Sequence, residues 1–313
     1  MKKGQKMSKA NFPIDPVLTA IAIAYRNRRM IADDVLPRVG VGKAEFKYKE
    51  YDLGEGFTIP KTHVGRTSRP NQVEFGFTEK TSSTEDYALD SPVPISDISN
   101  APKGYSPTGR ATEQTTNLIL LDREVRTAGL VFNKKSYASN NYKKLSGADQ
   151  WTHDDSKPLK LLLESLDSLV MRPNIMVLGQ KAASALRQNK SIIKGYNGTL
   201  GDDGLVPLEY LRDKLELDAI YVGQALVNTV NIAKKPVLAH AWGNHCSLIY
   251  RDKLADANSG TTFGLTAQFG DRETRQIFDE DMGMRGGYRI RVGESVRELI
   301  TARDLGVFLE DVI

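Results

Sequence analysis

The sequence predicts an α+β protein in which a long β-hairpin and a strut-like helix precede a compact α/β unit. Two alternating runs, EFKYKEY and VEFGFTEK, predict the strands of the hairpin, and a polar segment rich in Gly and Pro separates them. A long helical periodicity follows the hairpin. After residue 157, short apolar runs typical of strands alternate with amphipathic runs typical of helices, which indicates a compact α/β unit.

The hairpin is the first sign of function. Phe46 and Tyr48 lie on one side of the first strand, and Val73, Phe75 and Phe77 alternate in the return strand. An isolated two-stranded ribbon is at best marginally stable in water. Because the hairpin has no apolar segment of its own to bury against, we expect it to lie on a partner. This favours assembly over catalysis.

The strut is predicted from Thr108 to Phe132. Its apolar residues recur at steps of three and four, which places them on one helical face. These residues are Leu118, Leu121, Val125, Ala128 and Phe132. The pattern places Arg123 and Glu124 off this face. At ~1.5 Å per residue the helix would be roughly 35–38 Å long, more than globular domains usually contain.

Composition narrows the function classes. The chain has 313 residues, of which 26% are charged and 40% hydrophobic, so it is long and apolar enough to bury a core. Its net charge of +4 is too small for a dedicated DNA-binding domain. The single cysteine, Cys246, excludes an intrachain disulfide and suits a reducing compartment. The apolar run VLTAIAIAY is shorter than the ~20 residues that a bilayer requires, so no membrane association is expected.

The remaining segments have simpler patterns. Residues 1–13 are lysine-rich and lack periodicity, as expected of an arm, and Asp15 and Pro16 open a short helix. The segment YALDSPVPISDISNAP predicts an extended, irregular connector because it carries several prolines and turn formers. We expect helices after Pro158 and in QKAASALRQN and LEYLRDKLEL, and strands in NIMVLG, AIYVG, PVLAHAW and CSLIYRD.

Chemical motifs are incomplete. The run Gly40–Lys43 lacks the first glycine of a phosphate loop, and no Ser or Thr follows its lysine. His240, His245 and Cys246 have no second ligand pair at zinc spacing. The run 279–281 is acidic, as solvated loops often are. The sequence therefore predicts no enzyme activity, no catalytic residue, no cofactor and no metal site.

The order of these segments resembles the major capsid proteins of tailed bacteriophages, the Hong Kong phage-type capsid fold. DPVLTAIAIAYRNRRMIADDVLP resembles the opening of one branch of that family, and TEDYALDSPV followed by NLILLDREVRTAGLVF resembles its passage into the spine helix. GGYRIRVGESVRELITARDLGVFLEDVI resembles the C-terminal strands of that branch. The resemblance covers essentially the whole chain.

The resemblance implies a division of the chain into parts. It implies an N-terminal arm and short helix at 1–40, an extended β-hairpin loop at 41–86, and a peripheral domain at 87–156 with its spine helix at 108–133. An axial α/β domain would follow at 157–290, and C-terminal strands at 291–313. The candidate intersubunit contacts are hairpin residues: Phe46, Tyr48, Lys61, Phe75 and Phe77. Some relatives cross-link through a lysine of this loop, but the sequence identifies no partners for Lys61.

The resemblance also implies partners and a location. The protein would assemble with copies of itself in pentamers and hexamers of an icosahedral shell around double-stranded DNA, bound without sequence specificity. About a dozen residues precede Phe12, which implies a separate scaffolding protein or none; a decoration protein and a portal are further partners. Its place is the virion, with assembly in the host bacterial cytoplasm. Two alternatives stay open: a soluble α/β nucleotide-processing enzyme and a DNA-binding packaging protein.

Overall fold

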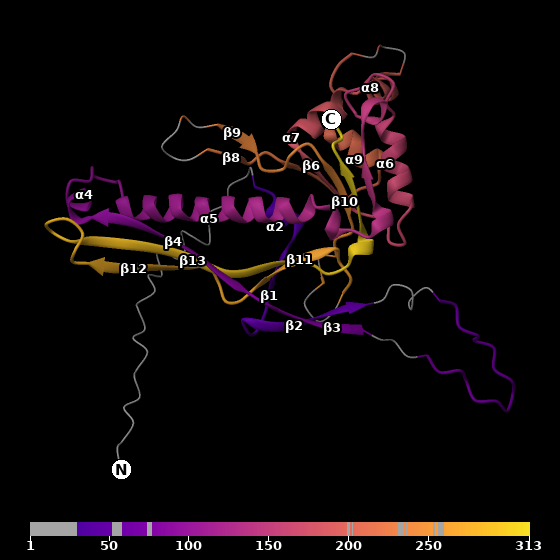
Figure 1. The fold of residues 1–313 in the computed structure, drawn as a ribbon, viewed down its shortest axis with the longest axis horizontal. Helices are drawn as coiled ribbons and strands as arrows, with labels where there is room; N and C mark the ends of the chain where they lie inside the picture. The colour runs from indigo at the N-terminus through magenta and orange to yellow at the C-terminus, as the bar shows by residue number, and fades with distance from the viewer. Residues whose placement is uncertain are drawn as a thin grey trace.

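A computed structural model describes residues 30–51, 58–73, 77–198, 201, 203–230, 235, 237–252, 254–255 and 260–313. Two five-stranded sheets form the body, and a long helix, α5 (Pro107–Val131), lies along the first of them (Figure 1). The mix of helices and sheets confirms the predicted α+β class. The expected arm and the short helix after Pro16 lie outside the described residues.

The first sheet is built around one long strand, β13. Its strands are β1 (Arg38–Gly40), β11 (Gly264–Gln268), β13 (Gly287–Ile300), β12 (Glu273–Asp279) and β4 (Glu85–Pro94). Strands β11 and β12 pair antiparallel with successive stretches of β13, and the Phe269 N–H donates to the Ser295 carbonyl between them at 2.9 Å. They therefore act as one long, interrupted partner of β13.

The proline-rich segment after the hairpin is a strand rather than the irregular connector predicted. Strand β4 pairs with β13 along ten residues, with Pro92 opposite Arg289 and Pro94 opposite Gly287. Among the described strands β4 pairs with β13 alone, so these prolines lie on an edge strand, where their missing N–H groups are tolerated. The short helix α4 (Ile95–Ser99) then leads toward α5.

The second sheet forms the α/β unit. Its strands, in order, are β5 (Tyr142–Lys144), β14 (Gly306–Glu310), β10 (Cys246–Ile249), β6 (Ile175–Gly179) and β7 (Ala219–Gly223). Its helices are α6 (Pro158–Asp167), α7 (Gln180–Gln188), α8 (Lys190–Asn197) and α9 (Leu208–Lys214). The sequence predicts most of these elements, but it predicts neither the short edge strand β5 nor helix α8. Beside them lies a small ribbon of β8 (Leu226–Asn228) and β9 (Leu238–His240).

Strand β6 joins the two cores of the molecule, because its alternate side chains point to opposite faces. Met176 and Leu178 belong to a core with the surrounding helices. Ile175 and Val177 belong to a second core with Trp242 and the C-terminal end of α5. Trp242 packs closely on strand β7, because a Cβ added at Gly223 would lie 2.1 Å from the Trp242 ring. The α/β unit and the long helix are thus packed directly together.

The two sheets do not follow chain order around residue 290. Strands β11 and β12 precede residue 290 but belong to the first sheet, whereas the C-terminal strand β14 lies in the second sheet. Strand β13 pairs with the nearby β11 and β12 and also with β4, which lies far away in sequence. Local periodicity carries no information on such pairings.

Helix α5 has the predicted extent, but its buried face differs in part from the predicted one. Pro107 is at its first turn, and the Ser106 hydroxyl accepts a hydrogen bond from the Gly109 N–H at 3.1 Å. Leu118 and Val125, placed by the sequence on the buried face, are 54% and 42% exposed. Ala128 is buried as predicted. The other buried residues include threonines and charged residues as well as apolar ones: Thr112, Thr115, Thr116, Ile119, Leu120, Arg123, Glu124, Thr127 and Val131.

Candidate functional site

The hairpin consists of β2 (Glu45–Tyr51) and β3 (Phe77–Ser83), which pair from Glu45↔Ser83 to Tyr51↔Phe77. Phe46 is only 8% exposed and packs with Leu265 and Ala267 of β11, and Tyr48 lies against the same cluster. The base of the hairpin is therefore buried on its own subunit. This corrects the expectation of a ribbon with nothing of its own to bury against, and it leaves Phe46 little surface for a neighbour.

Beyond its base the hairpin projects into solvent. Every described residue from 58 to 73 is exposed, Lys61 among them. We call residues 58–73 the hairpin loop; it extends away from both sheets (Figure 1). Phe75 lies outside the described residues, and Phe77 is placed in β3 without a described side chain. Their predicted contacts with a neighbour stay predictions.

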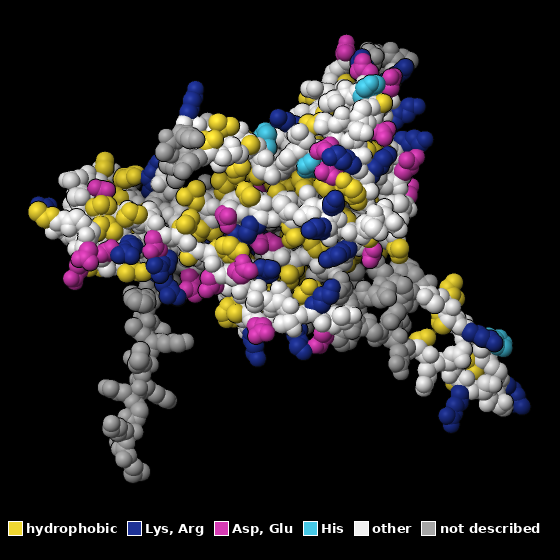
Figure 2. Space-filling view, in the orientation of Figure 1, with side chains coloured by type: hydrophobic (Ala, Val, Ile, Leu, Met, Phe, Trp, Pro, Cys, Tyr) yellow, Lys and Arg dark blue, Asp and Glu magenta, His cyan; other side chains and the backbone are white. Residues whose placement is uncertain are grey.

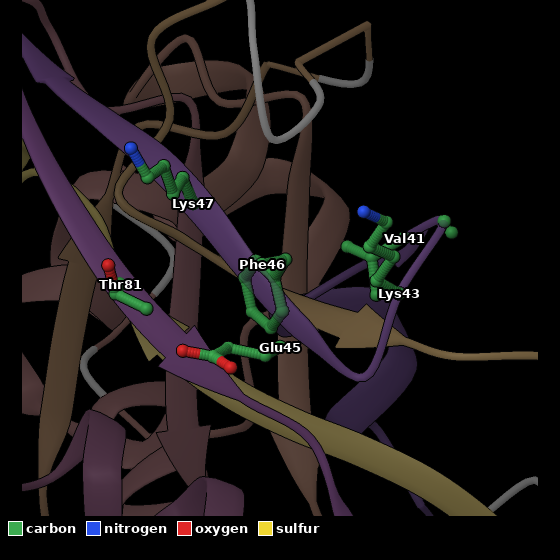
Figure 3. Close-up of a pocket in the computed structure, with 8 residues that line it drawn as sticks. Val41, Lys43, Glu45, Phe46, Lys47 and Thr81 are labelled. Atoms are coloured by element: carbon green, nitrogen blue, oxygen red, sulfur yellow. The ribbon is translucent and has the colours of Figure 1, made fainter.

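An open hollow of about 540 Å³ lies where β1 turns into the hairpin (Figure 3). Its lining includes Gly40, Val41, Gly42, Lys43, Glu45, Phe46, Lys47 and Thr81. The Gly-rich run here joins two strands and does not open a helix, so it lacks the helix N-terminus of a phosphate loop. The Lys47 ammonium is paired with Glu79 at 2.7 Å.

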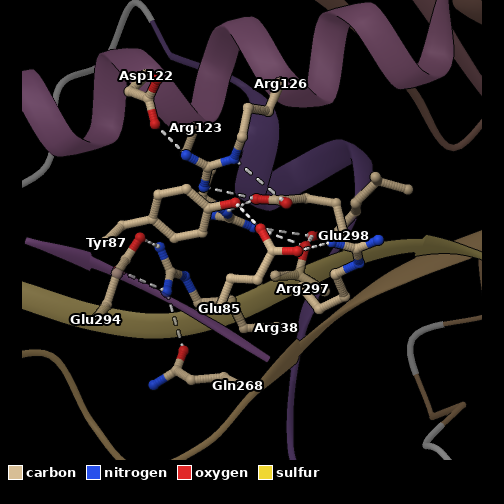
Figure 4. Close-up of polar contacts among 12 residues, drawn as sticks. Arg38, Glu85, Tyr87, Asp122, Arg123, Arg126, Gln268, Glu294, Arg297 and Glu298 are labelled. Atoms are coloured by element: carbon tan, nitrogen blue, oxygen red, sulfur yellow. Dashed lines mark hydrogen bonds and ion pairs between the residues drawn. The ribbon is translucent and has the colours of Figure 1, made fainter. Parts of the chain in front are cut away.

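A partly buried ion-pair network, which we call the polar clamp, lies between α5 and the first sheet (Figure 4). Its members are Asp33, Arg38, Arg123, Arg126, Arg272, Glu294 and Glu298. At one end, the Glu294 carboxylate accepts from Arg38 at 2.9 Å and from Arg272 at 2.8 Å. Burial alone would raise the pKa of Glu294, but the two guanidinium groups outweigh it and lower the pKa.

The other end of the clamp fastens α5 to the sheet. The Arg123 guanidinium pairs with Asp33 and donates to the Thr266 hydroxyl at 2.9 Å. One turn further along, Arg126 donates to Glu298 at 3.0 Å and lies over the Tyr87 ring, 3.6 Å from its centroid. The helix, β11, β13 and β4 are therefore held by directional contacts as well as by packing.

A buried carboxylate anchors the chain that enters the body from the N-terminal side. Glu124 of α5 accepts hydrogen bonds from the backbone N–H groups of Ile31 (2.8 Å) and Ala32 (2.9 Å) and from the Trp242 indole (2.6 Å). Burial raises the pKa of Glu124, against the opposing effect of these donors. Ile31 and Ala32 precede and open the short helix α2 (Ala32–Val35). This carboxylate joins three segments that are far apart in sequence.

Glu124→Gln should lower the free energy of unfolding by about 1–3 kcal/mol, because an amide NH₂ would face a backbone or indole N–H and leave a buried donor unsatisfied. Equilibrium urea unfolding of the unassembled subunit measures the loss. Glu113 lies on the exposed face of the same helix, so Glu113→Gln is the matched control and should change little. Equal unfolding midpoints for the two variants would contradict this anchoring role.

Sequence reasoning missed both the clamp and the Glu124 anchor. The helical periodicity places Arg123 and Glu124 off the buried face, because it locates that face by its apolar residues alone. A usable signal was present, since threonines recur at three- and four-residue steps from Thr112 and lead to Arg123. A row of small polar residues along one face of a helix can mark the face that packs against a sheet, just as a row of leucines can.

The residues that the sequence analysis considers as catalytic or metal-binding candidates are buried or paired with other residues of the chain. Cys246 is fully buried in the α/β core, and burial raises the pKa of its thiol. His245 Nδ1 accepts from the Asp311 N–H at 3.0 Å. Asp279 pairs with Arg289 at 2.7 Å. Within the described residues, no cluster of three His, Cys, Asp or Glu side chains could hold a metal, and none of the helices is long and apolar enough to cross a membrane.

Comparisons with known proteins give the family from a sequence relative and the fold from solved structures. The family model described as phage major capsid protein E matches residues 137–222. The chain is 61% identical over 307 residues to the major capsid protein of Pseudomonas phage JBD67, covering 98% of this chain and 99% of the relative. Of the solved structures, a phage-related protein from Bordetella bronchiseptica RB50 matches with a TM-score of 0.77 and 23% identity, covering 96% of this chain and 98% of that one. The capsid of cyanophage P-SCSP1u matches with a TM-score of 0.59 and 11% identity, covering 92% and 89%.

Proposed function

Because this chain belongs to the phage major capsid proteins, we propose that it closes into pentamers and hexamers of a phage head that encloses double-stranded DNA. The protein is a structural component of the virion and not an enzyme. Its fold is that of phage capsid proteins. Heterologous contacts, in which different surfaces of two copies meet, generate closed rings when the rotation between copies permits.

The observation that carries the proposal is the exposed hairpin loop. Residues 58–73 project from the body, and each of them is exposed in the isolated subunit. A long protruding loop can reach a neighbouring copy. With its base fixed by Phe46 on β11, the hairpin has a defined direction in which to reach. Lys61 and the hairpin aromatics Tyr48, Phe75 and Phe77 remain the proposed contacts.

The polar clamp supports the proposal because it would make the subunit rigid. A shell requires each subunit to hold fixed angles between its contact surfaces, since small errors accumulate around a ring. The ion pairs from Arg123 (3.6 Å) and Arg126 (3.0 Å) of α5 to Glu298 of β13 oppose sliding of the helix over the first sheet. We infer that α5 and the sheet act as one rigid unit during assembly, with the second sheet at the ring centre.

Further partners are inferred from charge and from the family. The lysines among residues 1–13 would touch packaged DNA through phosphate contacts, which carry no sequence specificity. A decoration protein and a portal would complete the head, and its assembly would use a separate scaffolding protein or none. Assembly would take place in the cytoplasm of the host bacterium.

Electron microscopy of the purified, concentrated protein tests the proposal. We expect closed particles of uniform size, with five- and six-fold units in averaged images. Size-exclusion chromatography over a range of concentrations provides the second measurement, because assembly by many weak contacts is steeply concentration-dependent. A preparation that remains monomeric or dimeric at every concentration would argue against self-assembly through the subunit's own surface.

A further inference from the structure

Asp311 follows strand β14 and has an unusual backbone conformation. Its φ of 54° lies in the left-handed region, which costs energy for a residue with a Cβ, although Asp tolerates it better than most. Its N–H donates to His245 Nδ1 at 3.0 Å, and its carbonyl accepts from the Gln150 side chain at 3.1 Å. Its carboxylate pairs with Lys144 at 2.8 Å. We call these contacts, which together hold Asp311 in place, the Asp311 latch.

The latch holds the segment after β14 against two other parts of the α/β unit. Val312, the next residue, is fully buried in the core of that unit. Its N–H donates to the Asn244 carbonyl at 3.0 Å, and its carbonyl accepts from the Trp151 N–H at 2.7 Å. Release of Asp311 would therefore loosen the chain around residues 151 and 244 as well.

His245 is held in place by its own surroundings. Its carbonyl accepts from the Gly179 N–H at 3.3 Å. Its ring meets the rings of Phe132 and Phe308 edge to face, with centroids 5.4 and 5.6 Å apart. The side chain is still 24% exposed, so protons from solvent can reach it. A change of pairing at this site is therefore taken up by Asp311 rather than by the imidazole.

The hydrogen bond from the Asp311 N–H requires a neutral imidazole. A protonated imidazole has two N–H donors and no acceptor. On protonation, an N–H on His245 Nδ1 would face the Asp311 N–H, and these two nitrogens lie 3.0 Å apart. The Asp311 carboxylate is an alternative partner, since its Oδ1 lies 3.6 Å from Nδ1. The site thus has two pairings, one for each protonation state of the imidazole.

The groups around the imidazole affect its protonation in both directions. Burial disfavours the charged form most strongly, Asp311 and Glu310 beside β14 favour it, and Lys144 of β5 opposes it. The pKa of His245 is therefore lowered from its ordinary value. The Tyr142 hydroxyl pairs with the Glu310 carboxylate. Figure 2 shows Lys and Arg side chains interspersed with Asp and Glu on the α/β unit, so charge of one sign does not dominate that part of the surface.

We propose that the Asp311 latch is an acid-sensitive switch, in which protonation moves His245 from the Asp311 N–H to the Asp311 carboxylate and releases residues 311–313 from the α/β unit. The released state binds the proton more readily than the latched state, because a free imidazole has a pKa of about 6.5. The latch is therefore complete above about pH 6.5 and opens as the pH falls through the lower pKa of the latched state. This switch goes beyond the proposed function and does not depend on it, since it belongs to the single subunit.

Hydrogen exchange of the unassembled subunit tests the switch. Mass spectrometry of peptides that contain the Asp311 and Val312 amides gives their protection factor, the exchange rate of an unstructured peptide at the same pH divided by the observed rate. From about pH 7.5 to about pH 5.5 the wild-type protection factor should fall by up to about tenfold, because at the lower pH a freed imidazole is about ten times more often protonated than neutral. Circular dichroism at both pH values checks that the subunit stays folded.

Asparagine in place of the histidine removes the titrating group and keeps an acceptor. In His245→Asn the amide oxygen can take the place of Nδ1, so the protection factor should change by less than about twofold between the two pH values. Lost ring packing would lower protection equally at both. His153 is the matched control, because its Nδ1 also accepts from a backbone N–H, that of Asp155 at 3.3 Å, but at an exposed and local site. His153→Asn should keep the wild-type pH dependence.

Proton NMR of the histidine rings follows the switch directly, since the chain has four histidines. We expect the His245 signal to titrate below about pH 6.5. Asp311→Asn should move its midpoint lower by roughly 0.5–1 pH unit, because the imidazolium then lacks its carboxylate partner. The shift in this variant also assigns the signal, so the measurement holds even where His245→Asn fails to fold.

Three results would overturn the inference. The first is a wild-type protection factor that stays the same from about pH 7.5 to about pH 5.5. The second is an equal pH dependence in wild type and His245→Asn, which would place the acid-sensitive group elsewhere. The third is a His245 midpoint at or above about pH 6.5, because the folded subunit would then prefer the imidazolium.

Discussion

Replacing residues 52–76 with a short Gly-Ser turn should leave the subunit folded and abolish particle formation. The replacement removes everything beyond the last strand pair, Tyr51↔Phe77, and keeps Phe46 packed on β11. Every described residue of the hairpin loop is exposed, so little folding energy is lost. Closure entropy also changes slowly with loop length. Circular dichroism and the thermal midpoint measure the fold, and electron microscopy measures the particles.

A second variant separates the reach of the loop from its side chains. Gly-Ser repeats placed at positions 58–73 keep the length of the loop but remove its charges and aliphatic groups. We expect this variant to fail in assembly as well, since a loop without side chains has nothing to bury on a neighbour. Normal particles from both variants would remove the hairpin from the assembly mechanism.

Much of the fold is predictable because local sequence patterns determine many of its helices and strands. The alternation in EFKYKEY and the cap and proline at the start of α5 each act on nearby backbone, so their elements appear where they are expected. The elements of the α/β unit, such as NIMVLG in β6, are found in the same way. The order of these elements along the chain is enough to indicate the family.

The sheets are less predictable because their pairing is nonlocal. The segment at 85–94 has turn formers and prolines, and it becomes a strand only because β13 offers it a continuous partner. That partner lies some 200 positions later in the chain. For the same reason, no pattern near residue 290 reveals that the chain remains in the first sheet there.

The candidate site is the least predictable part, and charge is the reason. A charged residue is read as exposed unless its partner is known, and the partners of Arg123 come from α2, β11 and β13. Conversely, Leu118 and Val125 are read as buried although the isolated subunit leaves them exposed. Whether a charged side chain is buried depends on partners from other segments of the chain, and the sequence of one helix does not reveal them.

Glu294→Gln should cause a large loss of stability. The Glu294 carboxylate is fully buried between Arg38 and Arg272, so neutralising it leaves two guanidinium groups with one neutral acceptor. Removing one partner of a buried ion pair costs about 3–5 kcal/mol. Urea unfolding of the unassembled subunit at pH 7 measures the change. Asp90 pairs with Arg291 on the same β13 strand at a more exposed position, and Asp90→Asn should cost at most about 1 kcal/mol.

The pH dependence of this loss has a definite sign. The pKa of Glu294 is lowered in the folded state, so the unfolded state binds the proton more readily. Its contribution to stability is therefore complete above the unfolded pKa of about 4.3 and declines as pH falls through the folded pKa. The gap between wild type and Glu294→Gln should be constant from pH 7 to about pH 5 and narrow below pH 4.3. A gap that stays unchanged on acidification to pH 3, or that is absent at pH 7, would show that the carboxylate charge does not hold the clamp together.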